Sequence, residues 1–114
     1  MKATFVHEGD AIDYRPSEEK PAGSVVVQNG LVGVTKRPLK EGELGSIHLT
    51  GVYELPKATG SDTALSVGTA VYWNASEGQV TTTATDNTPL GRVTAEAGDD
   101  DETVQVKLIP TLST

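Results

Sequence analysis

Apolar and polar residues alternate along most of the chain with a period of two residues. Residues 45–57, GSIHLTGVYELPK, show this alternation best. The residues on its apolar side are Ile47, Leu49, Gly51, Tyr53 and Leu55. Successive side chains of a strand point to opposite faces, so the pattern predicts one half-buried strand. The glycine in the middle of the apolar row is the irregularity that needs an explanation.

The same alternation, interrupted by turn residues, predicts strands along the whole chain. We expect them at residues 3–6, 11–14, 24–28, 31–37, 45–57, 69–75, 79–85, 90–97 and 103–109. Asn29-Gly30 is a strong hairpin-turn dipeptide. No apolar row keeps helical spacing over three turns, although the polar connector could hold one short helical turn beginning at Ser61 or Asp62. The chain is therefore predicted to be all-β, a small barrel or sandwich of short antiparallel strands and hairpins.

One domain is expected, with an N-terminal arm and loop at 1–23, a β domain at 24–109 and a frayed tail at 110–114. The predicted core is Val25, Val27, Ile47, Leu49, Tyr53, Leu55, Val71, Trp73, Val93, Val104, Val106 and Leu108. Gly51 is expected to admit a ring, from Tyr53 or Trp73, or to permit the bend that closes a small barrel. A valine at that position should then overpack the core.

Composition narrows the class of protein. Of the 114 residues only 36% are hydrophobic and 4% aromatic, so the core should be thin and oligomerisation would help stabilise it. The net charge of −7 argues against binding to nucleic acids and to anionic membranes. Without cysteine the chain has no disulfide, no thiolate nucleophile and no cysteine-bound zinc. Neither a signal peptide nor a membrane-spanning stretch is recognisable, so we expect a protein that is made in a cytoplasm and is not exported by a visible signal.

The residues that could carry chemistry are few. His7 and His48 are the first suspects for acid–base work, but no second ionisable group is tied to either, and solvent-facing histidines are the commoner case. The run GDDDE at 98–102 invites a calcium interpretation, yet its carboxylates are consecutive and suit a hairpin turn better. We therefore expect no enzyme activity, no metal site and no cofactor.

The aromatic residues allow two interpretations. Trp73 shares a face of its strand with Val71, and Tyr72 points to the other face. The functional interpretation of Trp73 and of the tyrosines Tyr14, Tyr53 and Tyr72 is an aromatic platform for a sugar or for single-stranded nucleic acid. The simpler interpretation puts Trp73 in the core and Tyr72 at a subunit contact. The small number of aromatic residues and the negative charge favour the second interpretation.

Several segments in the same order resemble one known family. GELGSIHLTGVYELPKA, LSVGTAVYWNASEGQVTTTATDNTPLGRVTAEA and ETVQVKL, preceded by GDAIDYRP and AGSVVVQNGLVGVT, are similar to capsid cement or head decoration proteins of tailed phages. The resemblance covers residues 5–108. It implies a β-rich, non-enzymatic oligomer on the outer surface of the expanded capsid, made in the bacterial host cytoplasm. Such a protein holds neighbouring capsomers together against the pressure of packaged DNA.

The partners implied by the resemblance are the major capsid protein and further copies of the chain, a trimer being favoured and dimers known in the wider class. The capsid-contact candidates are Ala3, Thr4, Phe5, Val6, Tyr14 and Arg15. Residues 3–6 could add to a strand edge of a capsid subunit, or pair within their own barrel. The alternative function is a carbohydrate- or cell-surface-binding module displayed on a phage particle.

Overall fold

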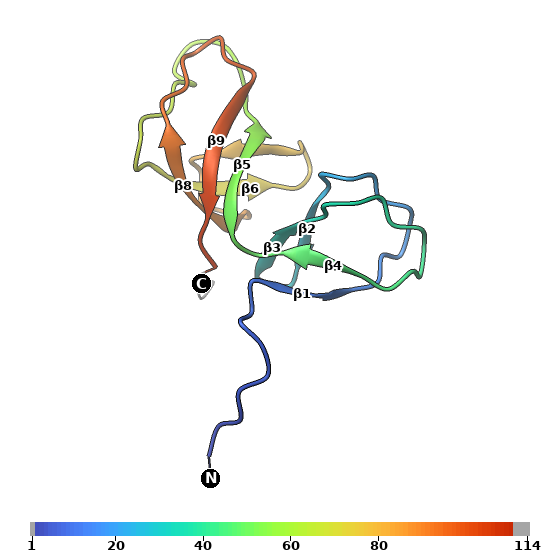
Figure 1. The fold of residues 1–114 in the computed structure, drawn as a ribbon. Helices are drawn as coiled ribbons and strands as arrows, with labels where there is room; N and C mark the ends of the chain where they lie inside the picture. The colour runs from blue at the N-terminus through green and yellow to red at the C-terminus, as the bar shows by residue number, and fades with distance from the viewer. Residues whose placement is uncertain (1, 111–114) are drawn as a thin grey trace.

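The computed structural model describes residues 2–110, which form two antiparallel sheets and no helix (Figure 1). The all-β prediction is confirmed. The four-stranded sheet has the order β1-β4-β3-β2. Its strands are β1 (Ala11–Tyr14), β2 (Val25–Gln28), β3 (Leu31–Val34) and β4 (Gly45–His48). The expected fraying at 110–114 falls, apart from Pro110, outside the described residues.

The five-stranded sheet has the order β5-β9-β8-β6-β7. Its strands are β5 (Gly51–Pro56), β6 (Ala70–Asn74), β7 (Gln79–Thr81), β8 (Thr88–Ala95) and β9 (Thr103–Leu108). Its edge strands approach each other at one isolated parallel bridge, Lys57 to Val80. Both sheets stay open in the described part of the chain, so a closed barrel is not formed. Asp62 lies in a turn with φ of 63°, where a helical turn was expected.

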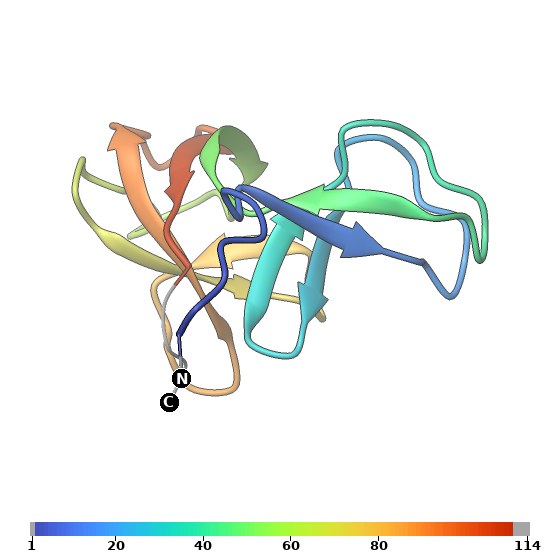
Figure 2. The same ribbon diagram turned by 60° about the horizontal axis from the view of Figure 1, so that its bottom comes forward.

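The predicted strand at 45–57 is two strands that belong to different sheets. β4 pairs with β1 and β3, whereas β5 pairs with β9. Between them Leu49 donates its backbone N–H to the carbonyl of Asp10, 2.8 Å away, and Gly51 has a φ of 115°. We call the segment 49–51 the crossing, because it is where the chain passes from the four-stranded sheet to the five-stranded one (Figures 1 and 2).

The larger hydrophobic cluster lies between the sheets. Val32 and Val34 of the small sheet pack in it with Val71, Val93 and Val106 of the large one. Trp73 is 8% exposed and belongs to the same cluster, so it plugs the core rather than serving as a binding platform. A second, smaller cluster of Val26, Ile47 and Leu49 fills the other face of the small sheet.

Of the predicted core residues Val27 lies outside the core, whereas Val25 and Tyr53 pack against its edge. In β2 the buried valine is Val26, whereas Val25 is half-buried and Val27 is 37% exposed. Hydrophobic clusters cover both faces of the small sheet, so valines on either face of β2 can be buried. The run of three valines therefore does not alternate with polar residues and does not indicate which valine is buried. Gly51 is exposed, Tyr53 is half-buried, and Leu55 is buried.

The role of Gly51 is conformational. A φ of 115° is strained for any residue with a side chain, and a Cβ there would lie 3.3 Å from the ring of Tyr53. Of the two rings expected near Gly51, the one that lies there is therefore Tyr53 and not Trp73. A side chain at this position would be disfavoured both by backbone strain and by contact with that ring. Gly51→Val is expected to lower the free energy of unfolding by about 1–3 kcal/mol, measured by urea denaturation.

Gly60 is the matched control, because it has the same φ of 115° but a Cβ added there would meet no atom within 4 Å. Gly60→Val should show the strain alone. An unchanged stability of Gly51→Val would contradict a conformational role for this glycine.

Candidate functional site

The first candidate contact segment is the arm, which we define as residues 2–10. None of its residues belongs to a strand, and Figure 1 shows it leaving β1 and running away from both sheets. Phe5 is 76% exposed and Val6 is 81% exposed. The strand expected at 3–6 is therefore absent from this chain, and pairing within its own barrel is ruled out for these residues. Their pairing with a capsid strand stays a prediction.

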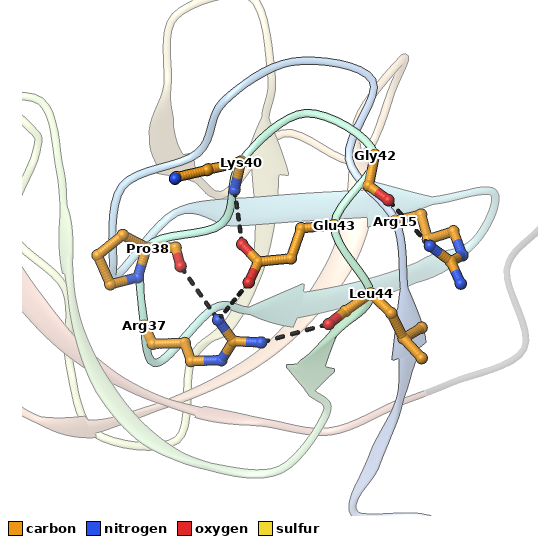
Figure 3. A network of polar contacts seen from close by, with 7 residues as sticks. All are labelled: Arg15, Arg37, Pro38, Lys40, Gly42, Glu43 and Leu44. Atoms are coloured by element: carbon orange, nitrogen blue, oxygen red, sulfur yellow. Dashed lines mark hydrogen bonds and ion pairs between the residues drawn. The ribbon is translucent and has the colours of Figure 1, made fainter.

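Tyr14 and Arg15, the other predicted contact residues, are already engaged within the chain. Tyr14 is half-buried and packs against the smaller cluster. Arg15 is exposed, and its guanidinium donates to the carbonyl of Gly42 at 2.9 Å, joining the loop after β1 to the loop before β4 (Figure 3). Arg15 thus holds two loops together, and its exposed guanidinium has further N–H donors beyond the one used in this bond.

The loop before β4 is organised by the carboxylate of Glu43. Its oxygens accept a hydrogen bond from the backbone N–H of Lys40, at 2.9 Å, and one from the guanidinium of Arg37, at 3.2 Å (Figure 3). The Lys40 hydrogen bond first, and then Arg37, hold the pKa of Glu43 below its ordinary value of 4.5. The carboxyl group of Glu43 therefore accepts these two hydrogen bonds in its ionised form.

This arrangement predicts an acid-sensitive loop. Because the pKa of Glu43 is lowered on folding, its contribution to stability is present above about pH 4.5 and is lost as the pH falls through the folded-state pKa. In an NMR titration the Lys40 amide shift should report a midpoint below 4.5. Glu43→Gln should abolish that transition. A Lys40 amide shift that does not change with pH in the parent protein would contradict the role given to the Glu43 carboxylate.

The acidic run 98–102 is a structured hairpin turn. Asp101 accepts a hydrogen bond from the backbone N–H of Gly98 at 2.8 Å. Asp99 accepts from the N–H groups of Thr63 and Ala64, at 3.1 and 2.9 Å. Carboxylates that bind backbone donors in this way favour the turn interpretation over the calcium interpretation.

Behind this turn lies Lys57, a residue that is only 5% exposed. Its ammonium group donates hydrogen bonds to the carbonyls of Ala58, Gly98 and Asp101 at 2.7, 3.0 and 3.0 Å. The side chain thus supplies an internal cation that ties the 58–63 connector to the acidic hairpin turn. The sequence does not indicate this role, because a lysine after Pro56 has the pattern of the start of a polar connector.

The histidines do not form a site in the described residues. His7 accepts a hydrogen bond through Nδ1 from the N–H of Gly9, within the arm. His48 lies opposite Ala11 and Val34 in the small sheet. Among residues 2–110 no three His, Asp or Glu side chains lie together as metal ligands would, and no helix there could span a membrane.

A slot lies beside a β-bulge in the large sheet. β6 pairs with β8 with a shift in register, so Leu90 has no partner in β6. The resulting hollow has a volume of about 300 Å³. We call it the bulge slot; its walls include Ala70, Tyr72, Ala84, Pro89, Arg92 and Ile109. Tyr72, expected at a subunit contact, thus lines a hollow at the surface, and no residue of the arm lines it.

The fold defines a small all-β protein with two packed antiparallel sheets, an exposed apolar arm and a surface slot. A family model described as "Phage cement protein" matches residues 6–108, nearly the whole chain, and the chain belongs to this family. Searches of curated proteins and of solved structures found no match. The protein is therefore a structural protein of a phage capsid, located on the virion.

Proposed function

We propose that the protein binds the outer surface of the expanded capsid as an oligomer and cements neighbouring capsomers against the internal pressure of packaged DNA. The observation that carries this proposal is the family match over residues 6–108. The exposed arm adds to it, because Phe5 and Val6 leave the body of the molecule with no partner among the described residues of their own chain. A segment of this kind is available for contact with another subunit.

An oligomer supplies the mechanism. Each copy needs only a modest affinity for the capsid. Once one copy of an oligomer has bound, the other copies are held close to the capsid surface, so their binding is effectively intramolecular. A trimer on a three-fold or quasi-three-fold position would touch several capsomers at once. Because capsid expansion changes the arrangement of the subunits, a site assembled from several of them would exist only after expansion.

The test is co-sedimentation of the purified protein with cement-free expanded heads, with unexpanded proheads as the control. Saturable binding to expanded heads alone is the expected result, and the copies bound per capsomer give the symmetry. Binding to neither particle would contradict the proposal. Equal binding to both would contradict its dependence on expansion.

The carbohydrate-binding alternative is not favoured. Its strongest candidate, Trp73, is buried between the sheets. Tyr14 is half-buried against the smaller cluster, and Tyr72 lies in the bulge slot instead of on an open aromatic surface.

A further inference from the structure

The bulge slot lies next to two cations that face each other across the sheet. Arg92 of β8 is the register partner of Lys107 of β9, and both side chains are exposed. Like charges directly opposite in a sheet repel each other. Within the described residues neither side chain has a carboxylate within ion-pairing distance. Arg92 instead donates to the carbonyl of Gly68 at 2.7 Å and so holds its place at the wall of the slot.

These two cations stand out against the charge of their half of the chain. Residues 51–114 contain nine acidic and three basic residues, and the third basic residue, Lys57, is buried. The surface beside the slot is therefore a small positive region in an acidic surrounding. A partly apolar hollow with Arg92 in its wall and Lys107 beside Arg92 fits a ligand that carries an apolar group close to carboxylates.

The arm has the matching chemistry. Phe5 and Val6 are exposed and apolar, and Glu8 and Asp10 follow them within five residues. At the rise of an extended chain Phe5 and Glu8 lie roughly 10 Å apart, and Gly9, with a φ of 80°, breaks the strict alternation of side-chain directions that follows Glu8, so a ring in the slot leaves Glu8 within reach of the two cations. The volume of the slot, about 300 Å³, is at the lower end of pockets that hold a small molecule.

We propose that the arm of one copy docks in the bulge slot of a neighbouring copy, with Phe5 in the slot and Glu8 and Asp10 facing Arg92 and Lys107. This inference rests on the proposed function, since it names the contact that holds the oligomer together. Passing each arm to the next copy is a head-to-tail contact, and such a contact gives a ring such as a trimer when the rotation between copies closes.

The positions of the arm and the slot support exchange between copies. Asp10, from which the arm departs, is hydrogen-bonded to the crossing, and Gly51 of the crossing pairs with Leu108 at the end of β9. Ile109, a wall of the slot, follows directly. The arm and the slot thus belong to the same end of the molecule, yet the arm points away from its own body (Figure 1). An extended segment of eight residues spans up to about 26 Å, enough to reach an adjoining copy.

Two variants test the contact from its two sides. Phe5→Ala removes the ring from the arm, and Ala84→Trp fills the slot from a loop position outside the strands. Each should weaken self-association by about 30-fold or more in analytical ultracentrifugation, as expected for loss of one buried aromatic side chain. Val67→Ala is the matched control, because Val67 is 64% exposed and does not line the slot, so it should associate like the parent.

Mixing the variants separates this contact from a general loss of structure. Phe5→Ala keeps an intact slot and Ala84→Trp keeps an intact arm, so together they should form a mixed dimer that neither forms alone. Arg92→Glu should also weaken association, and Glu8→Arg should restore it in a mixture. Unchanged self-association of Phe5→Ala and Ala84→Trp would overturn the proposal.

Binding to heads distinguishes the remaining outcomes. If Phe5→Ala keeps its oligomeric state but no longer co-sediments with expanded heads, the arm docks on the capsid and the arm-exchange proposal is wrong while the cement function stands. If the parent protein does not bind heads at all, the proposed function fails, whatever the oligomer does. A monomeric parent protein whose Phe5 is protected by its own slot would also overturn the exchange.

Discussion

Lys57→Met is expected to lower the free energy of unfolding by about 3 kcal/mol or more, because it removes the buried, charged donor that three carbonyl groups share. Methionine keeps most of the side-chain volume but offers no N–H. The carbonyls of Ala58, Gly98 and Asp101 would then lose a common partner. For a domain of this size such a loss corresponds to a fall in Tm of roughly 10–20 °C.

Urea denaturation followed by Trp73 fluorescence measures the effect. Lys36→Met is the control, since Lys36 is exposed and its ammonium has no hydrogen-bond partner within residues 2–110, and it should change stability by no more than about 0.5 kcal/mol. Equal stabilities of the two variants would show that the Lys57 ammonium does not hold the acidic hairpin turn in place.

Gly91→Ala is expected to have the second large effect, of about 3 kcal/mol or more. A Cβ at Gly91 would collide with the carbonyl oxygen of Lys107 and lie 2.9 Å from its carbonyl carbon and 3.1 Å from the backbone nitrogen of Ile109. These are backbone atoms of the neighbouring strand and the residue after it, so no side-chain rotation relieves the clash. β8 and β9 would have to separate beside the bulge at Leu90.

Gly98→Ala is the control for Gly91→Ala, because a Cβ at Gly98 meets only a carboxylate oxygen of Asp101, 3.7 Å away. Thermal unfolding of the two variants should differ by more than about 10 °C for a difference of this size. Comparable melting temperatures would mean that the β8–β9 pairing tolerates a side chain at Gly91.

The sequence predicts those parts of the fold in which the alternation of apolar and polar residues marks a strand and a turn joins it to the strand with which it pairs. The alternation of 103–109 and the Asn29-Gly30 turn each describe a strand or a hairpin that forms from neighbouring residues. Asn29 adopts a φ of 57°, as a turn of this composition requires. The all-β class follows from many such local signals.

The sequence could not show where strands change sheets. Residues 45–57 alternate without a break, and the division of the run between two sheets shows only in the strand pairings and in the backbone angle of Gly51. The same limit applies to the arm: ATFV has the composition of a strand, but composition does not supply a partner, and the described part of the chain offers it none.

The candidate site was harder to predict than the fold because it depends on distant pairings. The cation pair needs the register of Arg92 with Lys107, and the slot needs the bulge at Leu90. Lys57 meets its carbonyl partners 41 and 44 residues further along the chain. Resemblance to the cement family supplied the function without these details.

The crossing at 49–51 also gives the molecule two unlike ends, which matters for its use as a display scaffold. The base of the arm and the end of β9 both lie beside the crossing, whereas the turn at 98–101 caps the opposite end of β8 and β9. A peptide fused before the arm would be carried into whatever surface the arm contacts. A peptide inserted between Asp99 and Asp101 would instead project from the far end of β8 and β9, away from whatever surface the arm contacts.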